Sequence, residues 1–236
     1  MLILAHRGYR KLYPENTICS MFKSFEADAD GIEFDIQKCL DGYIVIHDIT
    51  IIKCGRLCDI RDLTVKEISG IRSGLNAIPE LKSFIKSIPN GKIVNAELKP
   101  DSITSADFKD LNKIFSKRKN DLIISSFDHS LLSDYSNSGY HTGALLDHEH
   151  FNKGFFNLLF SLKKINLHSV NIPIDFFYKI RGFKRAVMIN LFRLVCRRII
   201  VWTVNKQEDF ELSSTWADIV ITDDVLTGTS FRNTRK

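Results

Sequence analysis

The sequence lacks the features that mark membrane-spanning, secreted and disordered chains. No apolar run approaches the ~20 residues that a helix needs to cross a bilayer, and no low-complexity segment or strict repeat is present. The N-terminus enters an apolar stretch directly, without the basic region and cleavage site of a signal peptide. The five cysteines are odd in number and form no C-x-x-C pair, which argues against a disulfide framework or a zinc site. We therefore expect a soluble cytoplasmic protein with reduced thiols.

An excess of one charge is also nearly absent. The 33 lysines and arginines stand against 28 acidic residues, and the net charge of +5 favours anionic ligands only weakly. Part of the positive charge is concentrated in residues 179–198, for which a solvated basic face is the simplest interpretation. Because the basic residues form no recognisable nucleic-acid-binding module, we expect no nucleic acid partner.

What the chain does contain is a regular alternation of short apolar runs and helical patterns. About eight such units predict a parallel sheet with crossover helices, closed into a (β/α)8 TIM barrel. We expect one domain over residues 1–236, with residues 48–79 as a small insertion on the rim after the second strand. The expected strands are 2–5, 31–37, 43–47, 92–99, 122–126, 142–146, 169–172, 199–204 and 218–222. The expected helices are 15–29, 64–71, 79–88, 106–117, 130–137, 151–164 and 184–197.

Charged residues interrupt two of the expected strands. Side chains alternate along a strand, so Glu33 and Asp35 share one face, and Asn95, Glu97 and Lys99 share another. Buried parallel strands normally read as apolar runs, and both polar series lie toward the carboxyl ends, where barrel enzymes keep their active sites. Each acidic residue alone would more often be solvated surface or part of a structural ion pair.

Convergence of Glu33, Asp35 and Glu97 would place three anions in a small volume. At an effective dielectric constant of about 20, one pair ~4 Å apart repels by ~4 kcal/mol. A divalent cation would offset this repulsion, and an all-oxygen set suits Mg²⁺ or Ca²⁺ better than zinc. The alternative is that Glu97 simply pairs with Lys99 or Arg7.

Two histidines and two cations complete the candidate site. His6 ends the first expected strand and His47 ends the strand at 43–47, while Arg7 and Lys99 could supply positive charge to a phosphate. A lone histidine is more often structural than catalytic. The ordered set, however, is typical of a metal-dependent site that cleaves phosphoesters.

The motifs that contain these residues resemble those of the glycerophosphodiester phosphodiesterase family. They are H-R-G at 6–8, P-E-N-T at 14–17, G-I-E-F-D at 31–35, D-G-x-x-V-x-H-D at 41–48 and E-L-K at 97–99. Further matches are S-F at 126–127, W-T-V-N at 202–205 and A-D-I-V-I-T-D at 217–223. The resemblance spans almost the whole chain and is weakest between residues 146 and 198.

This resemblance implies the barrel, the insertion after His47 and a role for each of eight residues. The implied metal ligands are Glu33, Asp35 and Glu97, the catalytic pair is His6 and His47, the phosphate contacts are Arg7 and Lys99, and the aromatic at the pocket mouth is Trp202. Within P-E-N-T, Glu15 and Asn16 are expected to brace the loop beside His6.

The expected reaction is hydrolysis of a small-molecule glycerophosphodiester to glycerol 3-phosphate and an alcohol. One histidine would accept a proton from the attacking hydroxyl and the other would donate one to the departing alkoxide. We assign His6 as base and His47 as acid, with the reverse left open, as is the choice between water and a neighbouring substrate hydroxyl as nucleophile. The alternatives are a lysophospholipase D-like enzyme, a glycan-directed diesterase, and a non-catalytic barrel that binds glycerophosphate.

The segment 151–165 carries more apolar side chains than one helix face requires. The main stripe at helical spacing is Phe151, Phe155, Leu158, Leu159 and Leu162. Phe156 and Phe160 fall partly off that stripe and widen the apolar surface. The favoured interpretation is a barrel helix packed on the sheet. The alternative is a lid or an element that makes weak contact with a membrane surface, helped by Lys163 and Lys164.

Overall fold

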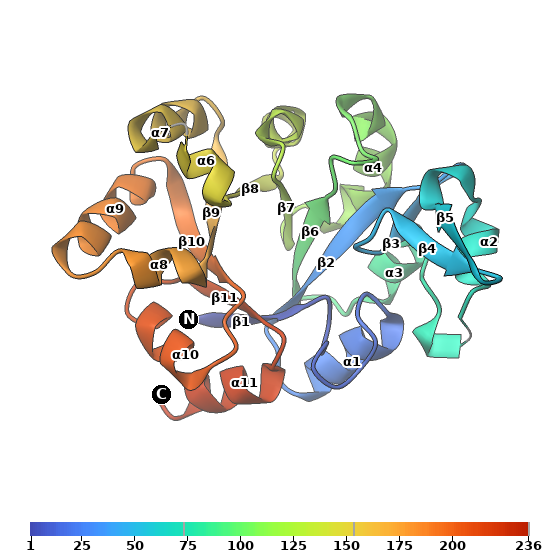
Figure 1. Cartoon of the computed structure of the whole chain (residues 1–236), viewed down its shortest axis with the longest axis horizontal. Helices are drawn as coiled ribbons and strands as arrows, with labels where there is room; N and C mark the ends of the chain where they lie inside the picture. Colours follow the sequence, from blue (N-terminus) through green and yellow to red (C-terminus); the bar gives the residue numbers. More distant parts are fainter. Residues whose placement is uncertain (73, 153, 236) are drawn as a thin grey trace.

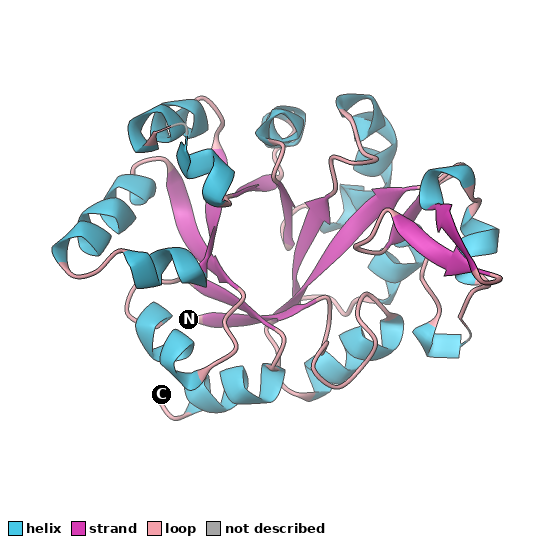
Figure 2. Cartoon of the chain, viewed as in Figure 1, coloured by secondary structure: helices cyan, strands magenta, loops and turns pink. Residues whose placement is uncertain are grey.

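The computed structural model describes residues 1–72, 74–152 and 154–235, and within them eight parallel strands form a closed barrel. Closure follows because the first strand pairs with both the second and the last (Figures 1 and 2). The predicted (β/α)8 TIM barrel is therefore confirmed. The barrel strands are β1 (Leu2–His6), β2 (Gly31–Lys38), β6 (Ile93–Leu98), β7 (Leu122–Ser126), β8 (His141–Leu145), β9 (Leu167–Pro173), β10 (Cys196–Trp202) and β11 (Ile219–Thr222).

Helices connect consecutive barrel strands and form the outer layer (Figure 2). They are α1 (Ile18–Glu26), α2 (Val65–Ser69), α3 (Leu81–Ser87), α4 (Phe108–Phe115), α5 (Leu132–Asn137), α6 (His148–Asn152), α7 (Phe155–Lys163), α8 (Ile174–Lys179), α9 (Phe183–Arg193), α10 (Gln207–Ser213) and α11 (Val225–Asn233). Single 3₁₀ turns are η1 (Ile60–Asp62), η2 (Gly74–Asn76), η3 (Ser105–Asp107), η4 (Ser116–Arg118) and η5 (His129–Leu131). Within the described ranges, every helix is too short or too polar to span a bilayer.

The apolar core has two layers, and the inner one forms the floor of the site. The outer layer lies between strands and helices, where Phe34 of β2 meets Phe84 of α3 edge-on, with ring centroids 4.8 Å apart. The inner layer fills the barrel with Leu4, Ile200 and Ile219. Above it, the inward side chains become polar, so the carboxyl ends of the strands enclose a polar mouth on an apolar floor.

Between β2 and β6 the chain leaves the barrel. Strand β3 (Tyr43–Val45) pairs antiparallel with β2, and a separate hairpin is formed by β4 (Thr50–Lys53) and β5 (Arg56–Asp59). A small apolar cluster that includes Ile44, Ile60 and Ile68 holds this segment together. The segment includes the residues 48–79 that were expected as an insertion, of which Ser73 lies outside the described residues. It lies at one side of the barrel in Figure 1.

The helix expected at 15–29 is shorter than predicted, and the difference shapes the site. Thr17 caps α1 because its Oγ1 accepts a hydrogen bond from the Ser20 amide at 3.1 Å. Asn16 adopts a positive φ of 55°, which no helix allows. Glu15 and Asn16 therefore stay in a loop at the barrel mouth.

The single helix expected at 151–164 is two helices. Gly154, with a φ of 91°, separates α6 from α7, because that backbone conformation cannot continue a helix; Lys153 lies outside the described residues. Leu158 and Leu162 are buried, as expected for a helix packed on the sheet. The alternative for 151–165, a weak contact with a membrane surface, stays a prediction. Helices α8, α10 and α11 and the β4–β5 hairpin were not predicted.

Candidate active site

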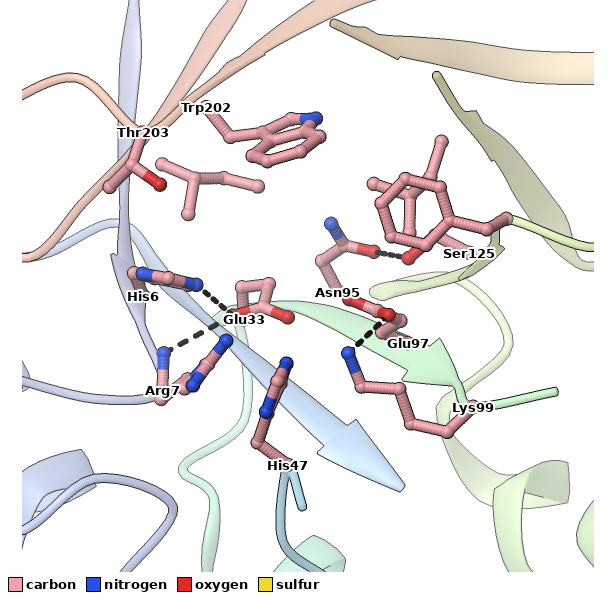
Figure 3. A pocket seen from close by; sticks show the side chains of 13 residues that line it. His6, Arg7, Glu33, His47, Asn95, Glu97, Lys99, Ser125, Trp202 and Thr203 are labelled. Atoms are coloured by element: carbon pink, nitrogen blue, oxygen red, sulfur yellow. Dashed lines mark hydrogen bonds and ion pairs between the residues drawn. The ribbon is translucent and has the colours of Figure 1, made fainter. Parts of the chain in front are cut away.

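A cavity of about 170 Å³ opens at the carboxyl ends of the barrel strands (Figure 3). Of the eight site residues expected from the sequence, all but Asp35 line this cavity. Asp35 is fully buried and contacts the lining residues Arg7 and Lys99. The structure thus brings together residues that lie almost 200 positions apart in the chain, from His6 to Trp202.

The three carboxylates meet because of strand register. Asp35 of β2 is the direct neighbour of Glu97 on β6, and Glu33 lies two residues earlier on the same face of β2. Each of the three offers an oxygen within 4.8 Å of the other two. All three side chains belong to buried residues, so water contributes little to neutralising their charge.

Asp35 is the carboxylate that the protein keeps ionised. Lys99 Nζ lies 2.9 Å from its Oδ1, Arg7 Nε lies 3.0 Å from its Oδ2, and Asn16 Nδ2 donates to Oδ2 at 2.9 Å. Burial alone would raise the pKa of Asp35, but the charges of Lys99 and Arg7 and the hydrogen bond from Asn16 hold that pKa below its usual value.

Glu33 and Glu97 show the opposite behaviour. Burial and the charges of the neighbouring carboxylates raise the pKa of Glu33 well above its usual value. Burial, followed by repulsion from Asp35, raises the pKa of Glu97 to about 7, although Lys99 Nζ lies 2.5 Å from its Oε1. Arg7 and Lys99 therefore do not completely offset the electrostatic repulsion among the three carboxylates.

This donor set fits a hard divalent cation. Mg²⁺ and Ca²⁺ bind oxygen ligands at roughly 2.0–2.6 Å, so oxygens up to about 4–5 Å apart can share one ion. The separations within the cluster fall inside that limit. Thiolate and imidazole ligands, which softer metals prefer, are absent from this group.

His6 is held by a carboxylate from the far end of the chain. Its Nδ1 lies 2.7 Å from Asp223 Oδ1, and its Nε2 lies 3.9 Å from Glu33 Oε2. Burial would raise the pKa of Asp223, but its hydrogen bonds with His6 and Asn205 keep that pKa below its usual value. Because an ionised carboxylate can only accept, Nδ1 of His6 carries the shared proton, and in the neutral ring Nε2 is then the acceptor nitrogen.

His47 approaches Glu33 from a different side than His6 does (Figure 3). It lies two residues beyond β3, and its carbonyl oxygen accepts a hydrogen bond from Gln37 Nε2 at 2.9 Å. Its Nδ1 is 2.7 Å from Asp48 Oδ1, and its side chain is 38% exposed. One imidazole is thus enclosed and the other faces the opening of the site.

The H-R-G motif has a local structural cause. Gly8 has a φ of 84°, and a Cβ atom there would lie 2.3 Å from Ser20 Oγ, so only glycine fits against α1. This close approach brings the Arg7 amide to Glu33, whose carbonyl oxygen accepts from it at 2.8 Å. The guanidinium of Arg7 reaches Glu15 at 3.0 Å. Glu15 and Asn16 therefore contact Arg7 and Asp35, so both touch site residues.

The opposite wall is aromatic. Trp202 meets Phe127 edge-on, with ring centroids 5.9 Å apart, and the indole Nε1 of Trp202 is buried without a hydrogen-bond partner. Between β6 and β7, Ser125 Oγ donates to Asn95 Oδ1 at 2.8 Å, and the buried Asn95 amide nitrogen has no hydrogen-bond partner (Figure 3).

Sequence reasoning did not assign several of these residues. Asn95 shares a strand face with Glu97, and Phe127 stands in the S-F motif. Both features were visible in the sequence, but no function was assigned to either residue. Asp223 stands in the A-D-I-V-I-T-D motif, but nothing in the sequence indicates that it pairs with His6.

Three comparisons with known proteins agree on one family. The model of the glycerophosphoryl diester phosphodiesterase family matches residues 6–227. A glycerophosphodiester phosphodiesterase of Caldanaerobacter subterraneus subsp. tengcongensis is 28% identical and covers 94% of both chains. The crystal structure of a glycerophosphodiester phosphodiesterase from Thermotoga maritima is 30% identical, covers 98% of both chains and superimposes with a TM-score of 0.84. An Oleispira antarctica phosphodiesterase, solved with sn-glycerol-3-phosphate, shares the fold at 16% identity and a TM-score of 0.78, covering 99% of this chain and 97% of its own.

The raised pKa of Glu97 predicts a pH-dependent response to divalent cations. Its folded value of about 7 exceeds the ordinary 4.5, so the metal-free fold loses stability as pH rises between those values. Mg²⁺ or Ca²⁺ at about 100 times its Kd should raise Tm by roughly 5–10 °C above pH 7. The rise should be smaller near pH 5, where a proton competes with the cation.

Thermal melts at both pH values, with and without cation, measure this effect. A Glu97→Gln variant serves as the control and should lose most of the cation response. An equal rise in Tm at both pH values, or none at either, would contradict the assignment.

Proposed function

Because this chain belongs to the glycerophosphoryl diester phosphodiesterase family and is a phosphoric diester hydrolase, we propose that it cleaves glycerophosphodiesters with His6 and His47 as its proton-transfer groups. The products are glycerol 3-phosphate and an alcohol. The observation that carries this proposal is the cluster of three buried carboxylates at a cavity that both imidazoles line.

Glu33, Asp35 and Glu97 are proposed to hold Mg²⁺ or Ca²⁺. Such a cation, when bound, withdraws charge from a non-bridging phosphate oxygen and so reduces the repulsion between a phosphodiester and a nucleophile. Arg7 and Lys99 are proposed to contact the phosphate. Their ion pairs with Glu15, Asp35 and Glu97 hold both cations in place at the cavity.

The contacts of each imidazole support the proposed proton assignments. We propose that His6, whose Nδ1 proton Asp223 accepts, takes the proton of the attacking hydroxyl through Nε2 of its neutral ring. His47, more exposed, is proposed to protonate the alkoxide as the bond from phosphorus to the leaving oxygen breaks. Water as nucleophile gives glycerol 3-phosphate directly, whereas attack by a neighbouring substrate hydroxyl gives a cyclic phosphate first.

The substrate is proposed to be a small-molecule glycerophosphodiester. Trp202 and Phe127 provide an apolar wall for the carbon skeleton beside the charged phosphate subsite. The Oleispira antarctica relative in complex with sn-glycerol-3-phosphate supports a ligand of this class.

We further propose a single domain over residues 1–236 with 48–79 as an insertion, and a cytoplasmic role in lipid metabolism. All five cysteines are free, which suits a reducing compartment. Residues 151–165 are proposed to make a weak contact with a membrane surface.

The leaving alcohol separates the alternatives. Glycerophosphocholine, a lysophospholipid and a glycerol-phosphate-bearing glycan should be offered in parallel, with coupled detection of glycerol 3-phosphate. We expect glycerophosphocholine to have the highest kcat/KM. A preference for either of the other two would assign the chain to the corresponding specialised diesterases, and turnover of none would favour a binding barrel.

Removing one site residue should abolish activity and leave the fold intact. His6→Ala and Glu33→Gln should each lower kcat by roughly 10³-fold. Tm without cation should hold or rise in Glu33→Gln, because the repulsion inside the cluster is relieved. The control is His148→Ala, an exposed histidine outside the cavity. Wild-type turnover by either site variant would refute the site.

The partner of His6 provides a second test. Asp223→Asn should lower kcat about 100-fold or more with little change in KM, because an amide no longer fixes the Nδ1 proton. Asp224→Asn is the matched control, since Asp224 caps α11 by accepting from the Thr227 amide. If both variants lose activity equally, the effect comes from the loop and not from the hydrogen bond to His6.

A further inference from the structure

Helix α7 is apolar on two faces. Leu158 and Leu162 are buried against the rest of the barrel, as any barrel helix requires. Phe156 and Phe160, four residues apart, are 75% and 67% exposed. One apolar face is sufficient to pack a helix on a sheet, so the fold does not account for the second.

Helix α9 repeats this arrangement. Met188 and Phe192 are buried. Phe183, Val187 and Leu194 are 83%, 38% and 76% exposed, and their spacing of four and seven residues places them along one side of the helix.

The two exposed faces belong to neighbouring helices. Phe155 of α7 packs edge-on against Phe192 of α9, with ring centroids 5.4 Å apart, and Figure 1 shows the two helices adjacent on the left of the barrel. We call the five exposed side chains the apolar patch, namely Phe156, Phe160, Phe183, Val187 and Leu194. Several large apolar side chains exposed on neighbouring helices are typical of an interaction site.

The segment that carries the apolar patch is rich in positive charge. Residues 151–199 contain ten of the 33 lysines and arginines and one of the 28 acidic residues, Asp175. Lys164 Nζ lies 4.8 Å from the centre of the Phe160 ring. Lys184 follows Phe183 directly and is exposed. Since the whole chain has a net charge of only +5, the rest of the molecule is net negative.

We propose that the apolar patch docks the protein on an anionic lipid bilayer. Exposed phenylalanines beside lysines match such a surface, because the rings enter the boundary between headgroups and acyl chains while the cations meet the anionic headgroups. A second copy of this chain fits less well, since it would bring the same positive charge against itself.

The position of the patch connects it to the catalytic cavity. Phe151 of α6 stacks on Phe176 of α8, with ring centroids 3.8 Å apart. This contact links α6, which precedes α7, to α8, which precedes α9. The residue before Phe151, His150, lies with its Nε2 3.2 Å from the carbonyl oxygen of Phe127, which lines the cavity. Docking through α7 and α9 would therefore place the mouth near the lipid surface, where lipid-derived diesters arise. This consequence rests on the proposed function, whereas docking itself does not.

Vesicle co-sedimentation of the full chain tests the proposal. The probes are phosphatidylcholine vesicles with and without phosphatidylglycerol. Wild-type protein should bind the anionic vesicles, and added salt should weaken that binding. Two variants should each reduce the partition coefficient about tenfold or more, namely the triple variant Phe156→Ser, Phe160→Ser, Phe183→Ser and the double variant Lys163→Glu, Lys184→Glu.

Matched controls change exposed residues elsewhere. Leu40→Ser with Leu226→Ser removes apolar side chains that are 64% and 52% exposed, and Lys82→Glu with Lys109→Glu reverses two charges on α3 and α4. Both controls should bind anionic vesicles within about twofold of wild type. All variants should keep the wild-type Tm and hydrolyse soluble glycerophosphocholine at the wild-type rate.

Several outcomes would overturn the proposal. They are equal binding of wild type to neutral and anionic vesicles, or wild-type binding by the patch variants. Self-association in sedimentation velocity that the triple variant abolishes, without vesicle binding, would assign the patch to a second copy instead. Vesicle binding by a chain that hydrolyses no diester would leave docking intact and refute only the proposed function.

Discussion

Three carboxylates that approach within 4.8 Å in a buried volume are the constraint on which the rest of the site depends. Like charges at that distance in a poorly solvated space are unfavourable unless cations offset them. Lys99 and Arg7 do so only in part, since they keep Asp35 ionised while the pKa values of Glu33 and Glu97 stay raised. The negative charge of Glu33 and Glu97 that these cations do not offset is the reason why we propose that the site binds a divalent cation.

Closure of the barrel joins this cluster to His6, the residue that we propose as the base. His6 ends β1 and Asp223 follows β11, and these neighbouring strands bring together residues 217 positions apart in the chain. The hydrogen bond between them forms only when the first and last strands pair. The orientation of His6 and the completed fold therefore depend on the same pairing of β1 with β11.

The sequence was most informative where a rule of short range applied. Alternation along β2 and β6 predicted that Glu33, Asp35 and Glu97 would face one volume, and the helical pattern at 64–71 correctly predicted α2, which Thr64 caps. It was least informative where distant residues decide. Asp223 as the partner of His6, and the pairing of Asn16 with Asp35, depend on tertiary packing. The break at Gly154 was missed because a glycine within an apolar helical pattern does not show by itself that its φ is positive.

The most direct test of the central claim is anomalous X-ray diffraction from crystals soaked in Mn²⁺, a stand-in for Mg²⁺ or Ca²⁺ that scatters anomalously. A single strong peak at the barrel mouth, bonded to one oxygen from each of Glu33, Asp35 and Glu97, is the result that this account predicts. A peak at any other side chains, or carboxylates that stay separated around no ion at saturating Mn²⁺, would contradict it.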